Sequence, residues 1–134
     1  YANTNFESAG IRVAKRADLG SDDLCLNTPP MGYTAETAPN ATVSKGLYSA
    51  SVFLDLSNAG AGHFARGSLY RLYVREKSSC YEFETRIGES QFANYPAGSI
   101  DEFTASDRAA LARKMQEIID HIVLDRKDDL FPHA

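Results

Sequence analysis

The chain has no tryptophan, only two cysteines among its 134 residues, and no apolar run near the length of a membrane span. A transmembrane helix needs about 18 or more consecutive apolar residues, so we expect no transmembrane segment. Residues Tyr1 to Asn5 also lack the basic and apolar regions of a signal peptide, which favours a mature or trimmed chain. The sequence does not decide whether a signal peptide or a lipobox, and therefore a lipid anchor, lies upstream of Tyr1.

Clusters of basic residues are also scarce. The formal net charge is -4, and the densest early group of cations is Arg12 with Lys15 and Arg16. Proteins that bind nucleic acid neutralise phosphates with clustered Lys and Arg side chains. We therefore expect no nucleic-acid partner.

The chain contains none of the compact motifs that carry hydrolytic, metal or phosphate chemistry. There is no GxSxG, no HExxH and no Cys/His signature. The acidic pairs at 22–23, 101–102 and 128–129 lack the spacing of a calcium loop, and Gly60-Ala61-Gly62 lacks the remaining residues of a phosphate loop. We therefore expect no metal and no cofactor, and the sequence favours a binding protein over an enzyme.

Cys25 and Cys80 lie far apart in the sequence, and neither belongs to a CxxC pair. We expect a disulfide between them, which would close a long loop and would indicate an oxidising compartment. The alternative is two reduced cysteines that are buried as small hydrophobic side chains.

The composition is that of a globular protein, with 43% hydrophobic and 24% charged residues. This length and composition predict one domain over residues 1–134. Alternating polarity predicts strands near 10–17 and 47–55, and Ser21 can cap a short helix that presents Cys25 inward. A longer helix is expected over 105–124, because apolar residues recur at helical spacing, namely Leu111, Met115, Ile118, Ile119 and Ile122.

The stretch from Gly60 to Ser90 organises the remaining prediction. Residues 70–75 and 81–87 alternate between apolar and charged side chains, and the polar turn 76–79 separates them, which is typical of an antiparallel hairpin. We expect an α+β fold with a sheet of about four to five strands and the helix 105–124 packed on the apolar face. The charged face is expected to be open to solvent.

This order of elements, extended segments with a tyrosine-rich hairpin and a closing amphipathic helix, resembles the PsbP-like α+β sandwiches. The resemblance concerns architecture and implies no activity.

The predicted open face supplies most of the candidate binding residues. Tyr and Arg are favoured at interfaces, and a histidine lies beside the Gly60–Gly62 segment, which we expect to be either a flexible loop or a place of close backbone approach. The candidates are His63, Arg66, Arg71, Tyr73 and Arg75. The alternative is an ordinary solvated sheet face with a solvated histidine.

Together these features predict a non-enzymatic domain that binds a protein or a small molecule. We expect an extracytoplasmic, bacterial location, which includes a periplasmic protein, a secreted protein and a surface-anchored lipoprotein. One alternative is an inhibitor or immunity-type protein directed against a cell-wall enzyme. Another is a hydrolase with a site near His63, for which Tyr70 is the second candidate residue.

Overall fold

The computed structural model describes residues 1–33 and 38–123. The elements in chain order are β1 (Phe6–Lys15), α1 (Asp22–Asn27), β2 (Ala41–Lys45), β3 (Tyr48–Gly60), β4 (His63–Val74), the 3-10 turn η1 (Arg75–Lys77), β5 (Ser79–Ser90), the 3-10 turn η2 (Phe92–Asn94) and α2 (Ala105–Val123). The predicted final residue of the last helix, position 124, lies outside the described residues.

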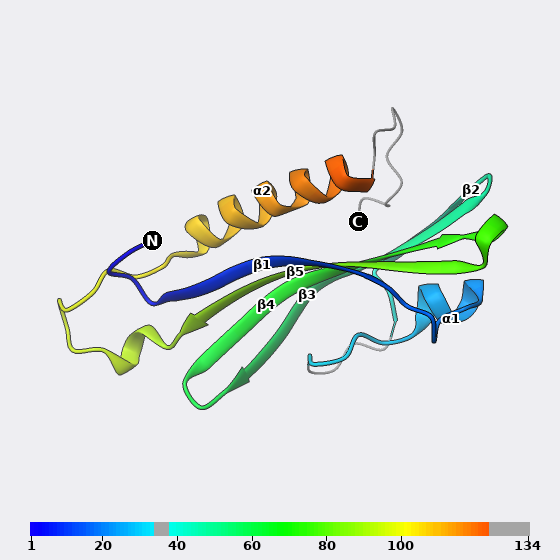
Figure 1. Ribbon diagram of the computed structural model, residues 1–134. Helices are drawn as coiled ribbons and strands as arrows, with labels where there is room; N and C mark the ends of the chain where they lie inside the picture. Colours follow the sequence, from blue (N-terminus) through cyan, green and yellow to red (C-terminus); the bar gives the residue numbers. More distant parts are fainter. Residues whose placement is uncertain (34–37, 124–134) are drawn as a thin grey trace.

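The five strands form one antiparallel sheet in the order β1-β5-β4-β3-β2. Strands β2 to β5 follow one another as neighbours, and β1 completes the sheet by pairing with β5. Helix α2 lies over one face and α1 lies against the other (Figure 1). The predicted α+β class, with an antiparallel sheet and a C-terminal helix on one face, is confirmed. The resemblance to PsbP-like sandwiches stays a prediction.

The main core lies between α2 and the apolar face of the sheet. Tyr70, Leu72 and Phe83 from β4 and β5 pack with the fully buried Ile119 of α2. A second cluster joins Ile87 and Met115 to another aromatic side chain, Phe103. Burying a large apolar side chain contributes about 1.5–3 kcal/mol, so these contacts hold the helix on the sheet.

Not every residue of the predicted apolar stripe on the last helix is buried. Met115 and Ile119 are buried and Leu111 is half-buried, but the side chain of Ile118 is 48% exposed. The helix therefore rests on the sheet along a narrower line than the sequence pattern indicated.

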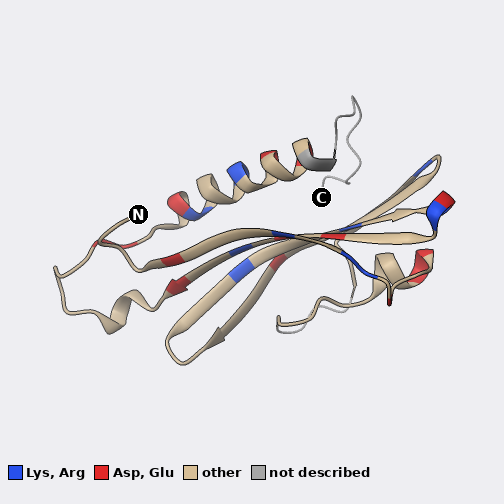
Figure 2. Ribbon diagram, viewed as in Figure 1, with Lys and Arg blue, Asp and Glu red and all other residues tan. Residues whose placement is uncertain are grey.

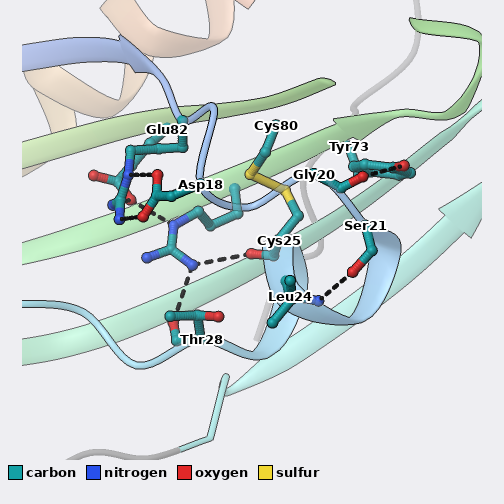
Figure 3. The surroundings of a disulfide bond; sticks show 11 residues. Asp18, Gly20, Ser21, Leu24, Cys25, Thr28, Tyr73, Cys80 and Glu82 are labelled. Carbon is teal, nitrogen blue, oxygen red and sulfur yellow. Dashed lines mark hydrogen bonds and ion pairs between the residues drawn. A yellow bond between two sulfur atoms is a disulfide. The ribbon is translucent and has the colours of Figure 1, made fainter. Parts of the chain in front are cut away.

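The opposite face of the sheet is covered near the turn between β4 and β5, and here the prediction of an open face is wrong. Arg71 is 1% exposed and Tyr73 is 7% exposed. A disulfide between Cys25 and Cys80 joins α1 to β5, as predicted (Figure 3). It packs with Tyr73 and Leu19. The short helix and the segment before it therefore form a second layer over this end of the sheet.

Helix α1 is positioned by local and long-range hydrogen bonds. Ser21 caps its first turn by accepting a hydrogen bond from the backbone N–H of Leu24, as its sequence predicts. At the other end, the guanidinium of Arg71 donates to the carbonyl oxygens of Cys25 and Thr28, at 2.9 and 3.0 Å. Arg71 thus satisfies carbonyls that the end of a helix leaves without partners.

The segment at 60–62, for which a flexible loop was one expectation, is a two-residue hairpin turn. Gly60 pairs with His63, and both Ala61 and Gly62 have positive φ, at 53° and 79°. Positive φ at both central positions is typical of the hairpin turn that matches the strand twist. The N–H of Gln91 also donates to the carbonyl of Gly62 at 2.7 Å, which fixes the turn against the start of η2.

Strand β3 extends beyond the predicted end at 55 because a bulge interrupts its alternation. The pairing between β3 and β4 shifts between Phe53 and Leu56, and Asp55 adopts a φ of 53°. An extra residue at a bulge reverses the polarity pattern, so the second half of the strand does not continue the pattern of the first.

Gly67 provides a sharp test of the packing on the α1 side of the sheet. A Cβ atom at Gly67 would lie 2.1 Å from the carbonyl oxygen of Thr85 and 2.9 Å from the hydroxyl of Tyr33, whereas one at Gly10 would meet nothing within 4 Å. We expect Gly67→Ala to lower the free energy of unfolding by about 1–3 kcal/mol. Gly10→Ala, the matched control, should change it by less than about 0.5 kcal/mol.

Urea unfolding followed by circular dichroism measures both glycine variants. Equal stabilities for the two would contradict the close approach of β4 and β5 at Gly67.

A candidate ligand-binding groove on the sheet

A shallow groove crosses the α1 side of the sheet beyond the part that α1 covers. Strand pairing places Ser8, Gly88 and Ala65 in one row across β1, β5 and β4, and the next row contains Gly10, Arg86 and Gly67. Because residues opposite one another in neighbouring strands share a face, these small residues form one floor. The groove has a volume of about 410 Å³ beside His63, and a hollow of about 350 Å³ continues it along β1.

His63 lies at the rim of this groove and contacts a carboxylate. Its Nδ1 atom is 2.7 Å from Oε1 of Glu7, and the two side chains are 60% and 41% exposed. The two residues come from β4 and β1, which lie on either side of β5. At Gly88 of β5, a Cβ atom would lie 2.8 Å from Oγ of Ser8, so the missing side chain keeps this part of the floor low.

Arg86 is an exposed cation in the middle of the groove, and both hollows include it. Its guanidinium lies 5.5 Å from the centre of the Tyr33 ring and forms no ion pair with any residue in the ranges 1–33 and 38–123. Burial, together with the charge of Glu84, raises the pKa of Tyr33 to about 12. The tyrosine hydroxyl therefore stays neutral at physiological pH, and it does not cancel the charge of Arg86.

The other basic residues of this face are neutralised by nearby acids. Arg12 binds Glu82 at 2.5 Å and Glu84 at 3.3 Å, and Arg16 binds Glu82 at 2.8 Å. Figure 2 shows basic and acidic segments lying close together on the strands. Arg86 therefore differs from Arg12 and Arg16, because it forms no ion pair with a carboxylate in the part of the chain that the structure describes.

The structure does not bring the five predicted binding residues together. His63 lies in the groove, Arg71 and Tyr73 are buried under α1, and Arg66 lies on the opposite face, 3.9 Å from Glu89. Arg75 donates to the carbonyl of Gly46 and to two serine hydroxyls, Ser44 and Ser49, so it holds the β2–β3 turn.

The residues that sequence reasoning missed are Arg86, Glu7 and Ser8. Alternation in β5 placed Arg86 on the charged face with Glu82 and Glu84, where a cross-strand ion pair was the simplest expectation. Glu7 and Ser8 join the groove only because β1 pairs with β5, and the sequence contains no local signal for that pairing.

Tyr70, the second residue of the hydrolase alternative, lies on the other face of the sheet from His63. It is buried beneath α2, where its hydroxyl donates to the side-chain oxygen of Gln116, and burial raises its pKa. The two residues therefore do not share a site.

Within residues 1–33 and 38–123, no group of three or more His, Cys, Asp or Glu side chains is arranged to hold a metal ion. In the same described ranges, no helix combines the length and the apolar character that crossing a membrane requires.

Comparison with known proteins gives no match to a protein-family model, a curated protein or a solved structure.

Proposed function

We propose that this protein is a non-enzymatic binding domain and that the groove between β1, β5 and β4 holds a small ligand with an anionic group. The observation that carries the proposal is Arg86, a cation that is exposed at the centre of a groove and has no described carboxylate partner. The planar guanidinium of an arginine matches the geometry of a carboxylate or a phosphate.

The surroundings of Arg86 support this proposal. Ser8 and His63 line the groove and can form hydrogen bonds with a ligand. Gly88 has no side chain and Ala65 has only a methyl group, so a ligand can approach the strands closely. A volume of about 410 Å³ lies within the range of small-molecule sites.

The disulfide favours an oxidising, extracytoplasmic environment. We propose a bacterial cell-envelope location, either as a periplasmic or secreted protein or as a lipoprotein anchored at the surface, and the disulfide supports the extracytoplasmic part of this proposal. The ligand would then be an anion that is present outside the cytoplasm.

Titration with inorganic phosphate and with acetate, followed by nuclear magnetic resonance, tests the groove. We expect saturable shifts at Gly88, Ala65 and their neighbours. Arg86→Gln should weaken binding about 10- to 100-fold, because hydrogen bonds to charged groups contribute about 1.5–3 kcal/mol. Arg113→Gln, which removes an exposed arginine from α2, is the matched control and should leave binding unchanged.

Two outcomes would contradict the anion proposal. The first is the absence of shifts at the groove with either anion. The second is equal affinity in Arg86→Gln and Arg113→Gln. Capture of a cell-wall enzyme in a stable complex would instead favour the inhibitor or immunity alternative.

One observation favours the hydrolase alternative. A histidine with a carboxylate on one ring nitrogen is part of the arrangement that activates a nucleophile, and His63 has Glu7 in that position. In the described residues, however, His63 forms no hydrogen bond to a serine, threonine or cysteine side chain. Turnover of p-nitrophenyl acetate that is lost in His63→Ala would favour the enzyme.

A further inference from the structure

A second groove lies on the opposite face of the sheet, along the flank of α2. Its volume is about 330 Å³, and its floor includes Ser68 of β4 and Thr85 of β5. Thr85 is 5% exposed, and its hydroxyl accepts a hydrogen bond from the N–H of Ser68, which leaves the hydroxyl proton available for a further bond.

The sequence of α2 creates this groove. Residues Ala105, Ala109 and Ala112 line it, and their spacing places them on one side of the helix. The second half of the helix instead buries the larger Met115 and Ile119. The first half of α2 therefore leaves space beside the sheet where the second half fills it.

The bulge in β3 contributes an acidic group to the same groove. Asp55 lines the groove, is exposed, and has a positive φ of 53°. Within the described ranges its carboxylate forms no hydrogen bond or ion pair. The bulge in β3 thus places the carboxylate of Asp55 in the groove, and no residue of the described ranges binds that carboxylate.

A basic group lines the groove from the neighbouring strand. Arg66 of β4 pairs with Ser57, two residues beyond Asp55, and its side chain is 52% exposed. The nearby Glu89 is already held by Arg108 of α2, at distances of 2.7, 3.0 and 3.3 Å. Because Arg66 lies 3.9 Å from Glu89, its guanidinium keeps most of its hydrogen-bonding capacity.

We propose that this groove binds a small zwitterion of amino-acid size. The ammonium group would contact Asp55, the carboxylate would contact Arg66, and an apolar side chain would lie along Ala109 and Ala112. The formal charges of the groove cancel. Arg108 is paired with Glu89, and the other two charged lining residues, Asp55 and Arg66, have opposite signs. A lining with separated charges and no net charge favours a zwitterion over a simple anion.

The volume supports a ligand of this size. Small-molecule sites range from about 300 to 1,000 Å³, and a groove of about 330 Å³ is at the lower end of that range. The second site lies on the other face of the sheet from Arg86, so it is independent of the anion groove.

Titration with L-leucine, followed by nuclear magnetic resonance, tests the proposal. We expect saturable shifts at Ser68, Thr85 and the first half of α2. Isocaproate, which lacks the ammonium group, and L-leucinamide, which lacks the carboxylate, should each bind at least about tenfold more weakly. Equal shifts from all three compounds would overturn the proposed charge recognition.

Three variants locate the site. Asp55→Asn keeps a residue type that tolerates positive φ, and Arg66→Gln keeps a polar side chain but removes the positive charge. Each should weaken L-leucine binding about tenfold or more. Ala109→Leu extends an exposed side chain into the groove and should abolish binding without lowering the melting temperature. Arg113→Gln is the control.

Two results would overturn this second site. One is the absence of saturable L-leucine binding to the native protein at millimolar concentration. The other is unchanged binding in Ala109→Leu together with Asp55→Asn. Shifts confined to Gly88 and Ala65 would place the ligand in the anion groove and would also reject the second site.

Discussion

The Glu82→Gln variant is expected to lose about 3–5 kcal/mol of the free energy of unfolding. Glu82 is 2% exposed and accepts hydrogen bonds from three arginines, at 2.5 Å from Arg12, 2.8 Å from Arg16 and 2.6 Å from Arg71. Arg71 is itself 1% exposed. The variant therefore leaves a buried cation whose remaining hydrogen bonds go to the neutral carbonyls of Cys25 and Thr28.

The same carboxylate makes stability depend on pH. Burial raises the pKa of Glu82, but the hydrogen bond from Arg12 and the charges of Arg71 and Arg16 outweigh this effect and bring the pKa below its usual value. The contribution of Glu82 is then fully present above the ordinary glutamate pKa of about 4.3 and is lost as the pH falls through the lowered folded-state value. Glu82→Gln should therefore lose less stability in acid than the wild type does.

Glu84→Gln is the matched control for this prediction. Glu84 lies two residues further along β5, its side chain is 14% exposed, and it binds the half-exposed Arg12 at 3.3 Å. We expect this variant to lose no more than about 1 kcal/mol. Urea unfolding followed by circular dichroism, from neutral pH to a pH of about 3, separates the two variants. The prediction would be refuted if Glu82→Gln and Glu84→Gln lost equal free energies of unfolding. It would also be refuted if acid lowered the stability of Glu82→Gln as much as that of the wild type.

Removing the disulfide has the second large expected effect. Cys25 and Cys80 are 55 residues apart in the sequence, and the chain-entropy model assigns a loop of this length about 4 kcal/mol. Both cysteines are fully buried beside Leu19 and Tyr73, so replacement of both by alanine also reduces packing there. We expect the double variant Cys25→Ala/Cys80→Ala to unfold at a much lower urea concentration than the wild type.

Reduction of the wild-type protein provides the control for the double variant. The reduced wild type should approach the stability of the double variant, and reductant should leave the double variant unchanged. In denatured protein, alkylation should label the cysteines only after reduction. Two thiols that react in the native protein without reductant, or a loss below about 1 kcal/mol, would contradict a stabilising disulfide.

Much of the fold could be predicted from local patterns in the sequence. Alternation in residues 70–75 and 81–87 predicted the hairpin β4–β5, and the spacing of Met115 and Ile119 predicted the helix that covers its apolar face. Ser21 predicted the start of α1. These features were accessible because side chains close in sequence determine which face a strand or helix buries.

Burial on the second face could not be predicted in the same way. Arg71 and Glu82 have the alternating positions of a solvated ion pair, and the sequence pattern of a buried pair is identical. Their burial depends on α1, which is held by a disulfide that spans 55 residues. The candidate groove could not be predicted for a similar reason. Glu7 contacts His63 across β5 only because β1 pairs with β5 in the observed register.

The position of β1 also has a consequence for the order of folding. Strands β2 to β5 can pair with their sequence neighbours as the chain emerges, but Phe6 pairs with Glu89, so β1 stays without its partner until β5 is complete. Contacts over such separations form slowly because loop closure carries an entropic cost. We expect the disulfide between Cys25 and Cys80 to form after β1 has docked, as both thiols pass two electrons and two protons to an external thiol oxidant such as oxidised glutathione. The appearance of the disulfide would then mark the last step of sheet assembly.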